Sequence, residues 1–490
     1  MDIRKIICPL LVIVFMTGSA FAVDEHELFH KKVEIKNGSE LSIGDCVASA
    51  YKNSPKIRRQ KYNLDIAKSN LGIAKSQYFP VFSAGVGFYN ENNSNNIYYD
   101  RTYRNLPSVE VALNKLIWNF GKTTAQIKME EFYKIAAEYE FMDSLCATLF
   151  DVKAKYYNVL KEQALDIIAK KNLELEENFV KIAKYKPDLT AAEIDYTQAK
   201  NNLVISQNAY RNAVVDLNNS MYLENIPDYT IKNTPTFNLR ADFTQKLNND
   251  DFTSEKFNFS RDKALDIAYA NSPDLQVLVN TKKAMEQSLL YIKRMYFPDL
   301  TANVGYGFNN NNIENTNNSL RVGVNLSSSV NLMELRHSIK GADAHVALAD
   351  NEITLFKKDL YFELKRAFNN VDKAERQIPI AKKVLLQAEA SLKVVETQYK
   401  NDKDEVDYTS YRDAIDDYIY ALKQYVNALY NYNIALIQVE MAMHYHIVDI
   451  HHKSEHAMHY HSDDLIQHLT EALGCDEHEE QHHKSKREKL

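Results

Sequence analysis

The sequence predicts an α+β protein built as two tandem copies of one unit, in which short strands join very long helices. Three observations predict this: motifs that recur at a fixed offset, a scarcity of glycine and proline, and apolar residues whose spacing changes from helical to alternating. The 490 residues include only 12 Gly and 10 Pro, less than half of ordinary usage. Because both residues break helix interiors, their scarcity favours long helices.

The internal repeat keeps one register over its first part. The motif Asn-Ser-Pro at residues 53–55 recurs at residues 271–273, an offset of 218 residues. Tyr-Phe-Pro at residues 78–80 recurs at residues 296–298 at the same offset. Such self-similarity indicates a duplicated structural unit. A further pair of matching segments follows at nearly the same offset, residues 185–197 and 399–409.

The repeat divides the chain into segments, of which the first is expected to be a secretory signal. Residues 1–22 contain a basic start, an apolar run and the small-residue site Ala20-Phe21-Ala22, which are the three parts of such a signal. The remaining segments that we expect are a first repeat over residues 23–221, an inter-repeat linker over 222–258, a second repeat over 259–443 and a His-rich charged tail over 444–490.

Each repeat is expected to open with two helices and then a hairpin of strands. A residue before proline avoids the helical region whereas proline suits a first helical turn, so one helix ends at Asn-Ser-Pro and a longer one begins there. After Tyr-Phe-Pro, apolar residues alternate with small or polar ones such as Glu110 and Arg321, which is typical of strands with one apolar face. The apolar positions are Phe82, Ala84, Val86, Phe88, Val109, Val111 and Leu113 in the first repeat, and Leu300, Ala302, Val304, Tyr306, Leu320, Val322, Val324 and Leu326 in the second.

Asn-rich loops at residues 90–96 and 309–318 are expected to close these strand hairpins, and long helices are expected to follow them. Residues 122–184 contain neither Pro nor Gly, which at about 1.5 Å per residue gives a rod of roughly 90 Å. In the second repeat, apolar residues from Tyr408 to Met443 keep the 3,4 spacing of a coiled-coil seam. Turns near Pro187 and Asp402 make each repeat end in a long helical hairpin, and Pro379 is expected to interrupt and kink the second long helix.

The alternating strands fit membrane-spanning β-strands, which have about 10 residues, polar turns and aromatic ends. The alternative is a half-buried sheet in a soluble domain. After the expected signal, no apolar run reaches the roughly 18 residues of a membrane helix, so any membrane part would be a β-barrel. Two hairpins supply four strands per chain, whereas the smallest membrane barrel has about 8. The sequence therefore predicts that several chains share one barrel, and three chains would supply twelve strands.

These features together resemble the TolC family of outer-membrane efflux and type I secretion channels, over residues 41–443. The resemblance rests on the repeat, the Phe-Pro junctions between helix and strand, the segment Leu116 to Gly121 that leads from strand to long helix, and the helical hairpins. It implies a homotrimer with a 12-stranded β-barrel in the outer membrane of a Gram-negative cell, continued by a periplasmic α-helical barrel. It also implies a periplasmic adaptor protein and an inner-membrane transporter as partners.

The resemblance also implies candidate sites at the helical turns, where the family usually carries Gly and this chain carries Pro, Asn or Asp. The candidates for adaptor contact are Tyr185, Lys186, Pro187, Asp188, Tyr399, Lys400, Asn401 and Asp402. In the family, an Asp just after the second turn lines the periplasmic entrance of the pore. Asp407 matches that position, Asp195 is its counterpart in the first repeat, and Asp404 and Glu405 are further candidates. The alternative is that these are solvated carboxylates in polar turns.

The tail is the one segment that suggests metal binding, because it holds 11 of the 15 histidines. On a helix, His452, His456 and His459 would share one face, with His461 nearby, and imidazole binds Zn, Cu or Ni. The alternative is a solvated low-complexity tail.

Other functions are less well supported by the sequence. A secreted coiled-coil structural protein would not need matching strand hairpins, and a periplasmic adaptor would carry Gly-rich strands that this chain lacks. The net charge of −7 gives no basic stripe for nucleic acid. No catalytic constellation is evident, so we expect neither an enzyme nor a cofactor. The cargo, whether drugs, metals or proteins, is left open.

Overall fold

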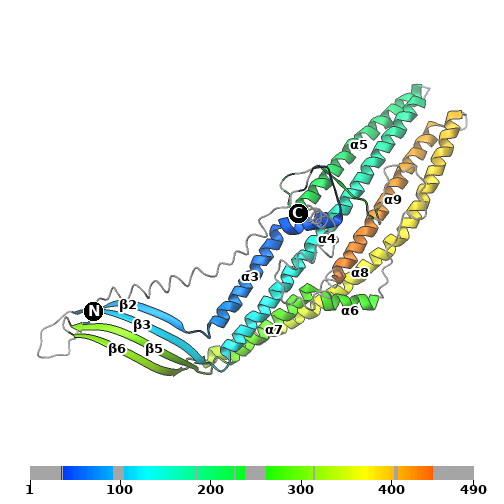
Figure 1. Ribbon diagram of the computed structural model, residues 1–490. Coiled ribbons are helices and arrows are strands. Elements are labelled where there is room, and N and C mark those ends of the chain that lie inside the picture. Colours follow the sequence, from blue (N-terminus) through cyan, green and yellow to red (C-terminus); the bar gives the residue numbers. More distant parts are fainter. Residues whose placement is uncertain are drawn as a thin grey trace, which may run out of the picture.

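A computed structural model of the chain describes residues 35, 37–91, 104–182, 186–223, 225, 228–234, 236–237, 261–312, 315–401 and 407–444. Figure 1 shows an elongated molecule in which a four-stranded sheet lies at one end and long helices extend away from it. The expected signal over residues 1–22 and the tail beyond His444 lie outside the described residues.

Two short helix pairs begin the two halves of the chain, as the prolines predict. Helix α2 (Ile43–Asn53) is followed by α3 (Pro55–Ser76), and α6 (Arg261–Asn271) by α7 (Pro273–Lys293). In each pair a buried serine before the proline caps the second helix, because its hydroxyl accepts the amide hydrogen bond of the third helical residue. The two cap distances are both 3.3 Å, from Ile57 N to Ser54 Oγ and from Leu275 N to Ser272 Oγ.

The predicted strand hairpins join into one antiparallel sheet. Its strands are β2 (Val81–Glu91), β3 (Arg104–Trp118), β5 (Asp299–Asn312) and β6 (Asn315–Ser327), in the order β2-β3-β5-β6. The central pairing joins β3 to β5, so strands from the two halves of the chain lie side by side. Within the described part of the chain, the outer strands β2 and β6 each have one free edge.

The prediction of a loop over residues 309–318 was wrong, because strand pairing continues through most of it. The ladder between β5 and β6 runs on to the pair Asn312 and Asn315. Asn disfavours strands, yet a partner strand already in register can keep the backbone paired beyond the apolar segment. In the first hairpin, β2 likewise extends to Glu91, and residues 92–96 lie outside the described residues.

The long helices form two hairpins that point away from the sheet (Figure 1). Helix α4 (Lys122–Ile182) and α5 (Lys186–Ser220) make the first, and α8 (Leu332–Asn401) and α9 (Tyr408–Met443) make the second. Helix α4 confirms the predicted rod up to Ile182. The predicted interruption at Pro379 is wrong, because α8 is one unbroken helix of 70 residues around it. No described helix has a stretch long and apolar enough to cross a membrane.

The predicted seam of α9 lies in the core between the helical hairpins, which confirms the 3,4 spacing. Tyr408 at the start of the seam is half-buried. The remaining seam residues are buried: Tyr411, Ile415, Tyr418, Leu422, Tyr425, Leu429, Tyr432, Leu436, Val439 and Met443.

A small parallel sheet ties two distant segments to α4. Strand β1 (Ser39–Leu41) pairs with β4 (Tyr229–Ile231), which lies in the segment expected to link the repeats. The hydroxyl of buried Tyr156 on α4 donates to the carbonyls of Leu41 and Lys232, at 3.1 and 2.5 Å. This contact fixes both strands beside the middle of the first long helix.

The junction between strand β3 and helix α4 is held by aromatic stacking and by one arginine. The rings of Trp118 and Phe120 stack at 4.3 Å between centroids, and those of Phe120 and Phe297 at 4.7 Å. Gly121 adopts a left-handed φ of 81°, and its carbonyl accepts a hydrogen bond from Arg294 Nη1 at 2.9 Å. The chain therefore turns from strand to helix through a backbone conformation that favours glycine.

Replacing Gly121 with Ala should lower the thermal midpoint of unfolding. The left-handed backbone costs a non-glycine residue about 1–2 kcal/mol, and the new Cβ would lie 2.6 Å from Arg294 Nη1. Gly72→Ala is the matched control, because it lies inside α3 with no atom within 4 Å of the added Cβ. Ala stabilises a helix interior by about 0.5–1 kcal/mol. Circular dichroism melts of the detergent-purified variants would contradict this if the two midpoints moved together.

Candidate functional site

The four-stranded sheet has one apolar face that no described helix covers (Figure 1). The strand register places the alternating apolar residues of all four strands in shared rows, such as Ala84, Val111, Tyr306 and Leu320. Val322 on β6 is 73% exposed. Such a continuous exposed apolar face is unusual for a surface in water. Its other large exposed members are Phe82, Val86, Val109, Leu113, Val304, Val324 and Leu326.

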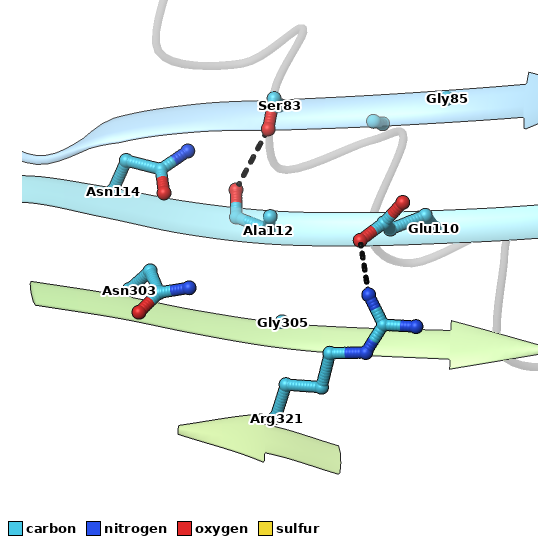
Figure 2. Close-up of a pocket in the computed structure, with 9 residues that line it drawn as sticks. Ser83, Gly85, Glu110, Ala112, Asn114, Asn303, Gly305 and Arg321 are labelled. Atoms are coloured by element: carbon cyan, nitrogen blue, oxygen red, sulfur yellow. Dashed lines mark hydrogen bonds and ion pairs between the residues drawn. The ribbon is translucent and has the colours of Figure 1, made fainter. Parts of the chain in front are cut away.

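The opposite face of the sheet is polar and is hollowed into a shallow open pocket of about 410 Å³. Figure 2 shows its side chains, which come from all four strands. Ser83 Oγ donates to the carbonyl of Ala112 at 3.3 Å, and Arg321 Nη1 lies 3.9 Å from Glu110 Oε1. The pocket is lined by Ser83, Ala84, Gly85, Glu110, Ala112, Asn114, Asn303, Gly305 and Arg321.

At the far end of the molecule, the structure brings the two predicted entrance carboxylates to neighbouring helices. Asp195 lies on α5 and accepts a hydrogen bond from the hydroxyl of Tyr408, the residue next to Asp407. Asp407 caps α9 by accepting from Ser410 Oγ and N, at 2.5 and 2.9 Å. These hydrogen bonds hold the pKa of the exposed Asp407 carboxyl below its ordinary value, so it carries a charge at neutral pH.

Four aromatic rings pack together beside these carboxylates. Phe179 on α4 lies 5.6, 5.2 and 4.6 Å, between ring centroids, from Tyr399, Tyr408 and Tyr411. Tyr399 and Tyr411 also stack on each other at 5.2 Å. The cluster therefore joins the first helical hairpin to the second close to their tips. Tyr399, predicted as an adaptor contact, is only 2% exposed because it lies in this cluster.

The other predicted tip residues are less constrained. Asp188 lies in the first turn of α5, and Lys400 forms an ion pair with Glu396 at 2.6 Å. Lys186, Pro187 and Asn401 lie at helix ends. The predicted site residues outside the described part of the chain are Tyr185, Asp402, Asp404, Glu405, His452, His456, His459 and His461.

A buried glutamate beside Asp195 was not predicted from the sequence. Glu176 on α4 is 3% exposed, and its Oε2 atom has no hydrogen-bond partner. Burial, with Asp195 and Asp416 nearby, raises its pKa to about 7, and Arg412 opposes the shift. The only local signal was its position three residues before Phe179 on the same helix face. Within the described ranges, no group of three or more acidic, His or Cys side chains is arranged to hold a metal ion.

Comparisons with known proteins agree with this arrangement. Residues 47–221 match the family described as outer membrane efflux protein. Outer membrane efflux protein BepC of Brucella suis is 24% identical over 200 residues, which make up 40% of this chain and 42% of BepC. The aligned part thus spans less than half of that relative.

Solved channel structures match over most of the chain. The CmeC outer membrane channel of Campylobacter jejuni has a TM-score of 0.68 at 15% identity, covering 86% of this chain and 91% of CmeC. The MtrE outer membrane channel of Neisseria gonorrhoeae has a TM-score of 0.65 at 13% identity, covering 84% of this chain and 93% of MtrE.

The fold is therefore that of the solved outer-membrane channels. Residues 47–221 thus resemble the outer membrane efflux protein family, in agreement with the sequence analysis.

Glu176→Gln should remove a pH dependence from the contact between the two helical hairpins. The folded protein favours protonated Glu176. The contact is therefore strongest below pH 4.5, the pKa of this glutamate in the unfolded chain, and weakens as the pH rises through its folded pKa of about 7. After correction for the intrinsic effect of pH on amide exchange, we expect exchange around residues 176–182 to be about tenfold faster at pH 8 than at pH 4.5. This figure includes a reduction for screening of the carboxylate by water.

The matched control for this pH experiment is Glu177→Gln, which alters a neighbouring, exposed glutamate paired with Lys181. It should keep the wild-type pH dependence, whereas Glu176→Gln should abolish it. An identical profile in the wild type and Glu176→Gln would contradict the assignment.

Tyr408→Phe should loosen the same contact at every pH. It removes the hydrogen bond to Asp195, which contributes about 1 kcal/mol and corresponds to roughly fivefold faster local amide exchange. Tyr420→Phe on the same helix is the control, because Tyr420 is mostly exposed. Equal exchange rates in the two variants would show that the hydrogen bond to Asp195 contributes nothing.

Proposed function

We propose that this protein is one protomer of a homotrimeric channel that provides an exit duct through the outer membrane for efflux or type I secretion. The observation that carries the proposal is a four-stranded sheet with two open edges, one apolar face and one polar face.

The free edges of the sheet are complementary. Successive strands in the order β2-β3-β5-β6 are antiparallel, so β2 and β6 also run in opposite directions. Strand β6 of one copy can therefore continue the ladder by pairing with β2 of the next. In lipid an unpaired backbone group costs several kcal/mol, and closure needs about 8 strands or more. Three copies would give a closed barrel of twelve strands, the number that the sequence predicts for three chains.

The helices next to the sheet repeat its order. Helix α3 packs on α4, α4 on α7, and α7 on α8, and these helices are joined to β2, β3, β5 and β6 respectively. The outer helices of this layer carry exposed apolar stripes at helical spacing. We infer that the α3 stripe packs against the α8 stripe of the next copy, which closes a helical barrel. The stripes are Tyr62, Ile66 and Ile73 on α3, and Leu348, Leu355 and Phe362 on α8.

The two faces of the sheet fix its orientation. A membrane barrel turns its apolar residues to lipid and its polar residues to the lumen. The row containing Val322 thus faces lipid, and the pocket around Glu110 and Arg321 faces the pore. A secreted coiled-coil protein without a pore would have no use for this exposed apolar face.

The order helix, helix, strand, strand, long helix, long helix occurs twice along the chain, and we infer that it arose by duplication of one unit. The serine caps at Ser54 and Ser272 support this, because they use the same geometry 218 residues apart. The proposed units are residues 23–221 and 259–443, with residues 222–258 between them.

The tips of the helical hairpins are the proposed entrance and docking end. The exposed, charged Asp407 supports a role at the pore entrance, with Asp195 behind it, because threefold symmetry would make a ring of carboxylates. The exposed ends of the hairpins, which include Asp188 and Lys400, are the proposed contacts for a periplasmic adaptor that works with an inner-membrane transporter.

The function is tested by deleting the gene and measuring sensitivity to drugs, sensitivity to metals, and secretion of proteins. We expect a defect in at least one assay, restored by the wild-type gene. Leu348→Glu combined with Leu355→Glu should fail to restore it and should lower the yield of trimer, because it places charge in the α8 stripe.

The control for the stripe variant is Lys357→Glu, since residue 357 lies on the opposite side of α8 from Leu355. It should restore function and keep the trimer. A deletion strain with no change in any of the three assays would argue against an export function.

A further inference from the structure

The polar face of the sheet carries two side chains of opposite charge that approach each other from strands separated by a third strand. Glu110 lies on β3 and Arg321 on β6, with β5 between the two strands. Their nearest charged atoms are 3.9 Å apart. Figure 2 shows the Arg321 side chain crossing above β5 toward Glu110, whose carboxylate lies over β3. The pair thus joins strands that are not neighbours in the ladder.

Glycines on β5 leave room for this pair. The register sets Gly307 opposite Glu110 and Gly305 opposite Arg321. A Cβ on Gly305 would lie 4.0 Å from Glu110 Oε1, so a larger side chain there would project into the path of the pair. The two charged side chains are 60% and 73% exposed, and solute passing over this face would meet them directly.

Few other charges lie on the described part of this face. Among residues 81–87, 109–118, 299–307 and 318–327, the one further charged side chain on the polar face is Asp299. Lys122 neutralises it at 2.7 Å, at the junction with the helices. The charge that a solute meets in the middle of the sheet therefore depends on Glu110 and Arg321.

We propose that Glu110 and Arg321 set the charge selectivity of the outer-membrane part of the pore by cancelling each other in every protomer. This inference rests on the proposed function, since it requires the polar face to line the pore of a trimer. Three cancelled pairs present no net charge, so anionic, cationic and zwitterionic solutes pass alike. Loss of one member leaves three like charges at one level, and such a ring favours ions of the opposite sign.

The test measures the local potential with a single cysteine on the polar face. Ala112→Cys is made in a Cys475→Ser background, because Cys46 and Cys146 are buried. Outer-membrane vesicles are treated with the anionic reagent sulfonatoethyl methanethiosulfonate or with cationic trimethylammonioethyl methanethiosulfonate. The readout is the ratio of the anionic to the cationic reaction rate. Ser83→Cys provides a second probe position in case Ala112→Cys lowers the yield of folded protein.

Glu110→Gln should raise this ratio about tenfold and Arg321→Gln should lower it about tenfold, because one unit charge a few ångströms away in water changes each rate by about threefold. The double variant Glu110→Gln/Arg321→Gln should return to the wild-type ratio. A ratio that stays within about twofold in both single variants, with a reactive cysteine, would overturn the inference and leave the proposed function standing.

Val322→Cys on the apolar face distinguishes failure of the proposed channel from failure of the proposed charge selectivity. It should stay unreactive toward both reagents, since it faces lipid in the proposed channel. A reactive Val322→Cys together with an unreactive polar-face cysteine would mean that the faces are reversed. That outcome would overturn the proposed function and this inference together.

Discussion

The pairing of main-chain groups at the edges of the sheet is the constraint on which the rest of the architecture depends. Among the described residues, β3 and β5 are paired on both sides, whereas β2 and β6 are each paired on one side only. A sheet placed in lipid, as we propose for this one, cannot leave such edges open. In the proposed trimer, a second and a third copy provide the missing partners, and the adjoining helices α3 and α8 present their apolar stripes along the same two sides.

In the proposed channel, the strand register decides which side chains face lipid and which face the pore. Because side chains alternate along a strand, a slip of one residue would exchange the two faces. The register shift between Leu116 and Trp118 lies where β3 leaves the sheet. Such a bulge bends a strand and re-aims its side chains. Beyond it, Gly121 and Arg294 turn the chain into α4, so the sheet and the long helices meet at a defined junction.

Features set by neighbouring residues were predictable from the sequence, and features made by contacts between distant residues were not. The helix boundaries at Pro55 and Pro273 follow from the chemistry of proline and a capping serine. The strand over residues 309–318 could not be foreseen, because pairing with a partner overrode the weak preference of Asn. The cluster around Glu176 was also missed, because it joins α4 and α5 to residues of α9, in the other helical hairpin.

Image averaging of the detergent-purified protein by electron microscopy tests whether three chains share one channel. We expect particles with threefold symmetry along their long axis, with a short β-barrel end continued by a helical tube. A monomeric rod without that symmetry would contradict this expectation.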